Sequence, residues 1–217
     1  MEENTIDGRH VTYYENGQIE CETHYEDGEE NGLNRSYYEN GQVFIEVIMK
    51  DGREDGELSI WHENGNKEIE AYYNDGRKVD KWFYWFEDGS ISGYQNWKNG
   101  KKDGKEIRYH ENGKIWLEEN YNKGKKHGKF ANWSQSGQLL IEEHYLYDKK
   151  NGKWREWFQN GQQKTEDNYI NGKKNGKSII WFENGQKSVE LNYLNGEKNG
   201  RPVCWSEFGG KWYDEIE

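Results

Sequence analysis

Residues 152–175 read GKWREWFQNGQQKTEDNYINGKKN, and the same pattern recurs every 24 residues along the chain. A glycine opens each unit and is replaced once, by Asp80; these glycines are Gly8, Gly32, Gly56, Gly104, Gly128, Gly152, Gly176 and Gly200. A second glycine series lies nine residues further on and has no gap: Gly17, Gly41, Gly65, Gly89, Gly113, Gly137, Gly161, Gly185 and Gly209. A fixed period of this length indicates a repeat protein in which each unit covers its neighbour.

The composition excludes a thick hydrophobic core. Of 217 residues, 31% are apolar and 33% are charged, yet 16% are aromatic, which argues against disorder. Large rings at fixed positions suit a thin sheet with one face covered by aromatic side chains. The repeats fill residues 1–217, so the sequence predicts a single domain whose units begin near residues 8, 32, 56, 80, 104, 128, 152, 176 and 200.

The order of residues within one unit predicts two strands. If the opening glycine is position 0, positions 5 and 17 are mostly aromatic and position 13 is mostly apolar, an alternation typical of strands. The recurrent Glu-Asn-Gly favours a three-residue hairpin loop, built on a type I turn with a left-handed glycine. Such a loop would pair position 5 with 11 and position 3 with 13. The second connection, such as 172–176, is expected to be a five-residue loop.

These features predict an all-β fold, an elongated single-sheet antiparallel β-hairpin solenoid of about nine 24-residue repeats. The sequence leaves open whether the sheet stays flat or curls. The terminal units would leave exposed strand edges, so end-to-end self-association is a further expectation.

The net charge of −11 is unevenly distributed. Residues 1–79 hold 20 acidic and 7 basic residues, whereas residues 80–217 hold 21 acidic and 23 basic residues. Acidic connections at 27–30 and 51–55 could steer a basic protein partner, such as a toxin that normally grips phosphates. The alternative is that these loops are simply solvated.

The fourth unit departs most from the pattern, in its first strand at 81–86. Phe83 and Trp85 are expected on the covered face of the sheet. The predicted partner-binding residues point the other way, as an outward aromatic cluster in which Tyr94 lies opposite Trp82: Trp82, Tyr84, Phe86 and Tyr94. Exposed aromatic patches tend to be interaction hot spots. The alternative is a sheet that curls and buries the patch against itself.

Pairs of lysines recur in the later connections and predict a basic ridge at a spacing of about 10 Å. The ridge consists of Lys101, Lys102, Lys125, Lys126, Lys149, Lys150, Lys173 and Lys174. Anionic lipid headgroups or phosphate backbones could bind there. The alternative, a solvated edge kept soluble by its lysines, is favoured because neighbouring carboxylates offset the charge. A weak anionic lipid contact is therefore a candidate, and no specific nucleic acid is expected.

Catalytic and metal sites are not predicted. Position 14 is glutamate in most units, but its members lie about 10 Å apart and cannot pair, so a structural role is expected; they are Glu22, Glu46, Glu70, Glu118, Glu142, Glu166 and Glu190. His62 and His110 lie two units apart, too far to share a metal. Cys21 and Cys204 fall in the first and last units, so no disulfide is expected. The sequence predicts no enzyme, no cofactor and no metal.

The N-terminal residues do not resemble a secretory signal, and no segment is long and apolar enough to span a bilayer. A cytoplasmic location is therefore expected, with association to the cell envelope if a signal was removed.

The aromatic pair at 157–158 before Gln-Asn-Gly, and Tyr169 followed by the Gly-Lys-Lys-Asn-Gly close at 172–176, resemble the MORN-repeat variant family, which includes the YwqK-family antitoxins of bacteria. The resemblance covers roughly residues 8–200, with a partial unit to Glu217. It implies a β-hairpin solenoid that binds a partner. That partner would be a toxin held inactive in bacterial members, or a membrane lipid or scaffold in other MORN proteins. The first expectation is a non-enzymatic antitoxin or immunity-like protein that sequesters a toxin, and the alternative is a membrane-lipid-associated or scaffolding module.

Overall fold

The computed structural model of this chain describes residues 6–213, which contain strands and connections and no helix. Contacts divide the chain into two compact units, residues 1–104 and 105–217. The first unit holds β1 Gly8–Tyr13, β2 Ile19–Glu26, β3 Glu29–Glu30, β4 Gly32–Tyr37, β5 Val43–Lys50, β6 Arg53–Trp61, β7 Lys67–Asn74, β8 Arg77–Trp85, β9 Ile91–Lys98 and β10 Lys101–Lys102.

The boundary between the units falls after the first residue of β11 Gly104–Tyr109. The second unit then holds β12 Ile115–Asn122, β13 Lys125–Lys126, β14 Gly128–Trp133, β15 Leu139–Leu146, β16 Lys149–Lys150, β17 Gly152–Trp157, β18 Gln163–Ile170, β19 Lys173–Lys174, β20 Gly176–Trp181, β21 Lys187–Leu194, β22 Glu197–Lys198, β23 Val203–Trp205 and β24 Lys211–Tyr213. The described part of the chain has no helix with the length and apolar character that a membrane span needs.

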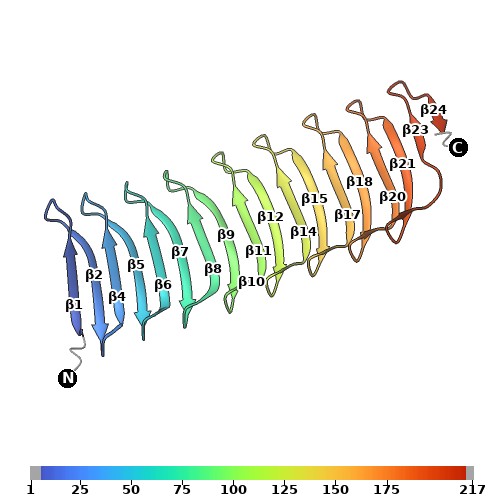
Figure 1. Cartoon of the computed structure of the whole chain (residues 1–217). Helices are drawn as coiled ribbons and strands as arrows, with labels where there is room; N and C mark the ends of the chain where they lie inside the picture. The colour runs from blue at the N-terminus through green and yellow to red at the C-terminus, as the bar shows by residue number, and fades with distance from the viewer. Residues whose placement is uncertain (1–5, 214–217) are drawn as a thin grey trace. The chain divides into compact units, whose positions relative to one another are not determined.

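Each unit is an open antiparallel sheet whose long strands pair in chain order. In the first unit β4 pairs with both β2 and β5, and in the second β15 pairs with both β14 and β17. A repeat supplies two long strands, and its turns gather along one border of the sheet, with the second connections along the other (Figure 1). The predicted all-β fold of antiparallel hairpin repeats is confirmed within each unit.

The hairpin turn has the predicted three-residue loop. The Gly17 amide donates to the Tyr14 carbonyl at 2.9 Å, the Tyr14 amide donates to the Gln18 carbonyl at 2.8 Å, and Gly17 has φ +86°. The Asn16 side chain serves the turn twice, because Oδ1 accepts from the Gln18 amide and Nδ2 donates to the Glu39 carbonyl of the following turn. The contact from turn to turn recurs at Asn40, Asn64, Asn112, Asn160 and Asn184. Asparagine at this position therefore both shapes its own turn and links it to the next.

The register beyond the turn corrects one prediction. Position 5 pairs with 11 as expected, in Tyr13 with Ile19, but Thr12 then pairs with Cys21, so position 4 and not position 3 faces position 13. Glu20 is the extra, unpaired residue of a β-bulge. The prediction had counted Glu20 as paired. The same shift occurs in β4–β5, β6–β7, β8–β9, β14–β15, β17–β18 and β20–β21. A shift of one residue changes which side chains share a face.

The second connection is tighter than the predicted five-residue loop. Asn171 and Gly172 have φ +49° and +85°, and β19 folds straight back so that Lys173 pairs with Ile170 and Lys174 pairs with Tyr169. Two consecutive residues with positive φ form the type I′ turn that Asn-Gly favours and that matches strand twist. The lysine pair is therefore part of a short strand and not of an open loop.

The bulge determines which side chains share each face of the sheet. Residues that pair across strands share a face, so the pairs Phe130–Glu143 and Asn132–Ile141 define one face, and Ala131–Glu142 defines the other. We call the first the aromatic face (positions 2, 4, 13, 15 and 17) and the second the charged face (positions 1, 3, 5, 11 and 14). The buried apolar residues, drawn from both faces, are Ala71, Trp82, Ile107, Phe130, Ala131 and Cys204.

Candidate binding surfaces

Trp82 is the centre of the aromatic face in the first unit. It is only 5% exposed, and its ring centroid lies 5.2 Å from that of Tyr73 and 5.8 Å from that of Trp97. Its indole N–H donates to the Tyr72 carbonyl at 3.3 Å, and the Lys78 ammonium lies 4.1 Å from its ring centroid. The prediction of an outward, exposed Trp82 is wrong, because side chains of its own repeat and of the preceding repeat cover it.

Tyr94 lies on the opposite face from Trp82. It pairs with Phe83, with ring centroids 6.4 Å apart, while Gln95 is the residue opposite Trp82. The Lys81 ammonium lies 4.6 Å from the Tyr94 ring centroid. The predicted pairing of Tyr94 with Trp82 is therefore wrong by one residue, and the cause is the bulge between Tyr84 and Trp85 in this hairpin.

The other two predicted residues are half-buried. Tyr84 shares the aromatic face, where its hydroxyl donates to Gln95 Oε1 at 3.2 Å. Phe86 begins the turn, where its amide donates to the Ser90 carbonyl at 2.8 Å. The structure thus does not bring the four predicted residues into one exposed cluster. Their part in partner binding remains a prediction.

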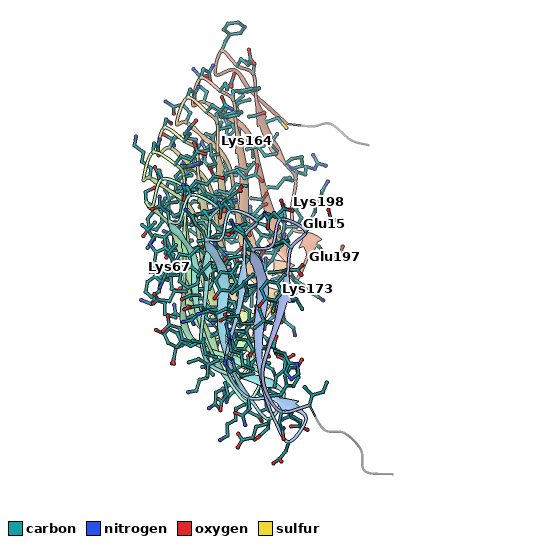
Figure 2. All side chains as sticks on the ribbon, turned by 90° about the vertical axis from the view of Figure 1, so that its left-hand side faces the viewer. Glu15, Lys67, Lys164, Lys173, Glu197 and Lys198 are labelled. Atoms are coloured by element: carbon teal, nitrogen blue, oxygen red, sulfur yellow. The ribbon has the colours of Figure 1, made fainter. Side chains whose placement is uncertain are left out.

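The lysine pairs divide into two kinds of residue. The first lysine of each pair is exposed (Lys101, Lys125, Lys149 and Lys173) and the second is half-buried (Lys102, Lys126, Lys150 and Lys174). Figure 2 labels Lys173 together with Glu197 and Lys198 of the following connection, which are also exposed. The ridge therefore presents one exposed lysine per repeat, with carboxylates nearby, and not the predicted continuous double row.

The half-buried lysines lie on aromatic rings. The Lys150 ammonium is 3.0 Å from the Trp154 ring centroid and 5.0 Å from that of Tyr169, and burial lowers the pKa of Lys150. Lys126 lies 4.8 Å from the ring centroid of Phe130. Such cation–π contacts contribute about 0.5–2 kcal/mol each. These lysines stabilise the aromatic face and are only partly available to a ligand.

The glutamate column of the charged face has the structural role predicted for it. Glu22 accepts from Arg9, and Glu166 accepts from Arg155 Nε at 2.9 Å. Glu190 accepts from Lys177 at 2.8 Å and from Lys187 at 2.6 Å. These partners come from the strands themselves and not from the connecting loops. The column is a set of ion pairs that join neighbouring strands.

The ion pairs of Glu190 predict a pH-dependent contribution to stability. Hydrogen bonds from Lys177 and Lys187 hold the pKa of Glu190 below its ordinary value of 4.5. A carboxyl with a lowered pKa in the folded state stabilises that state above the unfolded pKa, and the contribution disappears as pH falls through the folded pKa. We expect Glu190→Gln to reduce the free energy of unfolding at pH 7 and to cost progressively less below pH 4.5, as measured by urea unfolding across that range. A difference from the parent chain that stayed constant with pH would contradict the ion-pair explanation.

The histidines and cysteines form no metal site in residues 6–213, which contain no suitable group of three or more ligands. His62 Nε2 lies 3.2 Å from the Trp85 carbonyl and His110 Nε2 lies 3.1 Å from the Trp133 carbonyl. The Tyr14 hydroxyl makes the same contact to the next repeat. The side chain at position 6 thus forms a hydrogen bond to the next repeat. This structural role accounts for the histidines at this position. Cys21 and Cys204 are free thiols.

The acidic connections of the first unit surround a hollow of about 450 Å³, lined by Glu29, Lys50, Asp51, Arg53, Asp55 and Asp75. Arg53 is bound to Asp75 at 2.5 Å, while Glu29 and Asp51 are exposed. We call this border, with the exposed Asp27, the acidic border. The structure brings together the two acidic connections that the sequence singles out.

Two carboxylates of the second unit, Glu119 and Glu143, are not singled out by the repeat pattern. Both occupy position 15, which lies on the aromatic face. The signal in the sequence is a change along this column, which is neutral in the first unit (Thr23, Val47, Ala71 and Gln95), acidic in the next three repeats (Glu119, Glu143 and Asp167) and apolar again at Leu191. The bulge must be known before position 2, with Phe130, can be placed on the same face as position 15.

Stacked hairpins with two exposed faces define a β-repeat protein suited to binding rather than to catalysis. The pattern of the MORN repeat variant matches residues 6–27, 30–51, 54–75, 102–123, 150–171 and 174–195. The chain belongs to this family. The resemblance seen in the sequence is thereby confirmed for the repeat type, and membership among the antitoxins remains a prediction. Residues 76–101 and 124–149 lie between the matched segments.

No curated protein matches this chain. Among solved structures it is similar to the Photorhabdus luminescens Tc holotoxin pore, at 13% identity and a TM-score of 0.26 over 93% of this chain. It is also similar to the TcdB2–TccC3–Cdc42 complex at 11% identity and a TM-score of 0.25, over 95% of this chain. In both cases the match spans 13% of the other chain. Likenesses this weak carry no argument about function.

Proposed function

We propose that this chain is a non-enzymatic binding protein that sequesters a basic protein partner, as an antitoxin or immunity-like protein does with a toxin. The observation that supports this proposal best is the acidic border of the first unit. Net charge in residues 1–79 is −13, and exposed carboxylates from successive connections gather there. A concentrated field of one sign attracts a partner of the opposite sign and orients it during encounter.

Sequestration needs only steric occlusion, so it requires no reactive group. The acidic border would draw in a basic surface, such as one that grips phosphate, and the sheet would cover it. Carboxylates that neutralise such a surface compete with its natural anionic substrate. The regular spacing of the connections, about 10 Å per repeat, offers several such contacts along one border.

The test is capture of the partner with the tagged full-length chain from its native host, followed by binding kinetics. We expect one dominant, near-stoichiometric basic protein whose toxicity is relieved by co-expression of this chain. The triple variant Asp27→Asn, Glu29→Gln and Asp51→Asn should slow association about tenfold or more at low salt. Asparagine tolerates the left-handed conformation of Asp27 and Asp51, at φ +53° and +49°, so the fold should persist.

A matched control removes three exposed carboxylates from the second unit, in Glu183→Gln, Glu197→Gln and Glu207→Gln. This variant changes the net charge by the same amount and should leave the association rate within about threefold of the parent. Equal slowing in both triple variants, or an association rate indifferent to salt, would rule out steering by the acidic border.

A second function, contact with anionic lipid, is favoured by the exposed lysine that recurs once per repeat. Co-sedimentation with vesicles containing phosphatidylserine at low salt would test it. Binding that disappears when Lys125, Lys149 and Lys173 are replaced by glutamine would support the lipid-associated alternative. Capture of lipid without any stoichiometric protein would displace the sequestration proposal.

A further inference from the structure

The aromatic face of the second unit contains a groove of about 200 Å³. Leu117 and Ile141 line it from neighbouring hairpins, with Asn132 between them in the register. Phe130 also lines it and is 4% exposed, so its ring lies at the bottom. The carboxylates of Glu119 and Glu143 complete the lining, one from each hairpin.

Both carboxylates are held in place by tyrosines. The Tyr121 hydroxyl donates to Glu119 Oε2 at 2.7 Å, and the Tyr145 hydroxyl donates to Glu143 Oε2 at 2.9 Å. Burial and these hydrogen bonds raise the pKa of both tyrosines, so the hydroxyls remain protonated donors. Within residues 6–213, neither glutamate has a cationic side chain in an ion pair. Each therefore keeps acceptor capacity for a cation from outside.

In the next repeat the acidic residue at this position forms an ion pair. Asp167 occupies the equivalent place to the two glutamates, and Lys174 pairs with it at 2.8 Å. The lysines that correspond to Lys174 in the two preceding repeats are Lys126 and Lys150, which lie on aromatic rings, as Lys174 does on Tyr193, but form no such ion pair within residues 6–213. Glu119 and Glu143 are thus the acidic members of the column that form no ion pair within residues 6–213, while Lys126 and Lys150 lie on aromatic rings nearby.

We propose that this groove binds arginine or lysine side chains of an extended segment of a protein partner. The aliphatic stem would pack against Leu117 and Ile141 while the charged head donates hydrogen bonds to the carboxylate of Glu119 or Glu143. The inference rests on the proposed function in taking the ligand to be a protein. It adds a contact on the second unit that is separate from the acidic border of the first.

The spacing of the two carboxylates restricts the sequence of the segment. Glu119 and Glu143 hold the same place in successive repeats, two strand spacings or about 10 Å apart. A polyproline II segment rises about 3.1 Å per residue and returns to the same side every third residue. Basic residues at positions i and i+3 of such a segment would face both carboxylates, at a separation of about 9 Å. Adjacent basic residues would not.

Lys126 is expected to oppose this binding. It lines the same groove, with its ammonium 4.9 Å from the ring centroid of Tyr145. A positive charge that lines the same groove repels an incoming cation in a partly buried site. Removing that charge should therefore tighten binding, the opposite of what loss of a direct ligand contact would do.

The experiment is calorimetric titration of the full-length chain with a capped, proline-rich peptide that carries two arginines three residues apart. The double variant Glu119→Gln and Glu143→Gln should weaken binding at least tenfold, since glutamine keeps the oxygen that accepts the tyrosine hydroxyl. Lys126→Gln should strengthen binding about threefold. A peptide of the same composition with adjacent arginines should bind at least fivefold more weakly.

The matched control is Glu183→Gln with Glu197→Gln, two exposed carboxylates of the same unit, which should leave the affinity unchanged. Equal affinity for the two peptides, equal loss in the control, or no loss in the groove variant would overturn the proposal. Because this assay uses no natural partner, it separates the two proposals. The peptide can bind the groove even if the acidic border does not steer a toxin. The acidic border can likewise steer a toxin even if the groove binds no peptide.

Discussion

Replacing Trp82 by alanine is expected to lower the free energy of unfolding by about 3–5 kcal/mol. The side chain is 5% exposed and lies between the rings of Tyr73 and Trp97, so its removal opens a cavity in the aromatic face. The variant also removes the indole donor from the Tyr72 carbonyl, and it removes one of the two rings that the Lys78 ammonium contacts. Urea unfolding followed by far-ultraviolet circular dichroism measures this loss.

Tyr13→Ala is the control, because Tyr13 occupies a strand of the same unit but is 61% exposed. Its loss should stay within about 0.5 kcal/mol, as for most surface substitutions. A loss below about 1 kcal/mol for Trp82→Ala would show that the ring contributes little to packing. That result would make Trp82 a candidate for partner binding again.

The expected destabilisation changes how a loss of partner binding in a Trp82 variant must be interpreted. A variant that unfolds locally loses binding whether or not the residue touches the partner. Exposed carboxylates of the acidic border, such as Glu29 and Asp51, are cleaner probes because their isosteric amides leave the packing intact. The charge variants should therefore be measured before any aromatic variant.

The fold was predictable because each local signal agrees with the others. Glu15-Asn16-Gly17 requires one residue with positive φ at a fixed place, and the same place recurs without a gap in every unit. A pattern repeated nine times averages out the ambiguity that a single short strand would leave. Turn type and strand order follow from this pattern, and both were predicted correctly.

The faces were not predictable to the same degree, because one unpaired residue per repeat decides them. Glu20 shifts the register beyond the turn by one place, and the sequence offers no cue that separates this bulge from continuous pairing. This error in register also misplaces the candidate binding residues. It placed Tyr94 beside Trp82, and it put position 2, with Phe130, on the opposite face from position 15, with Glu119 and Glu143.

Side-chain contacts between repeats are a second feature that the sequence does not predict. Lys126 and Lys150 look like ridge residues in the sequence, since a lysine beside a lysine suggests a solvated edge. Their ammonium groups instead reach rings of the following repeat, such as Tyr145 and Trp154. A long flexible side chain can cover apolar surface while its charge stays near water, so its destination depends on packing that periodicity does not describe.

Gly56→Ala is expected to destabilise the first unit by about 2–4 kcal/mol. Gly56 has φ +134°, a conformation that is essentially restricted to glycine. A Cβ added there would lie 3.1 Å from both Cβ and Cδ1 of Ile48 on the neighbouring strand, so the methyl group adds a clash to the backbone strain. Urea unfolding of the variant and the parent chain gives the difference.

Asp80→Gly supplies the matched control at the same place in the next repeat. Asp80 has φ +58°, which lies in the left-handed region that aspartate tolerates, so glycine should change stability by less than about 1 kcal/mol. Equal effects at both sites would contradict an explanation based on backbone angle. A large effect at Gly56 alone would show that the opening glycine is retained for close strand packing, and that Asp80 marks a repeat where this packing has relaxed.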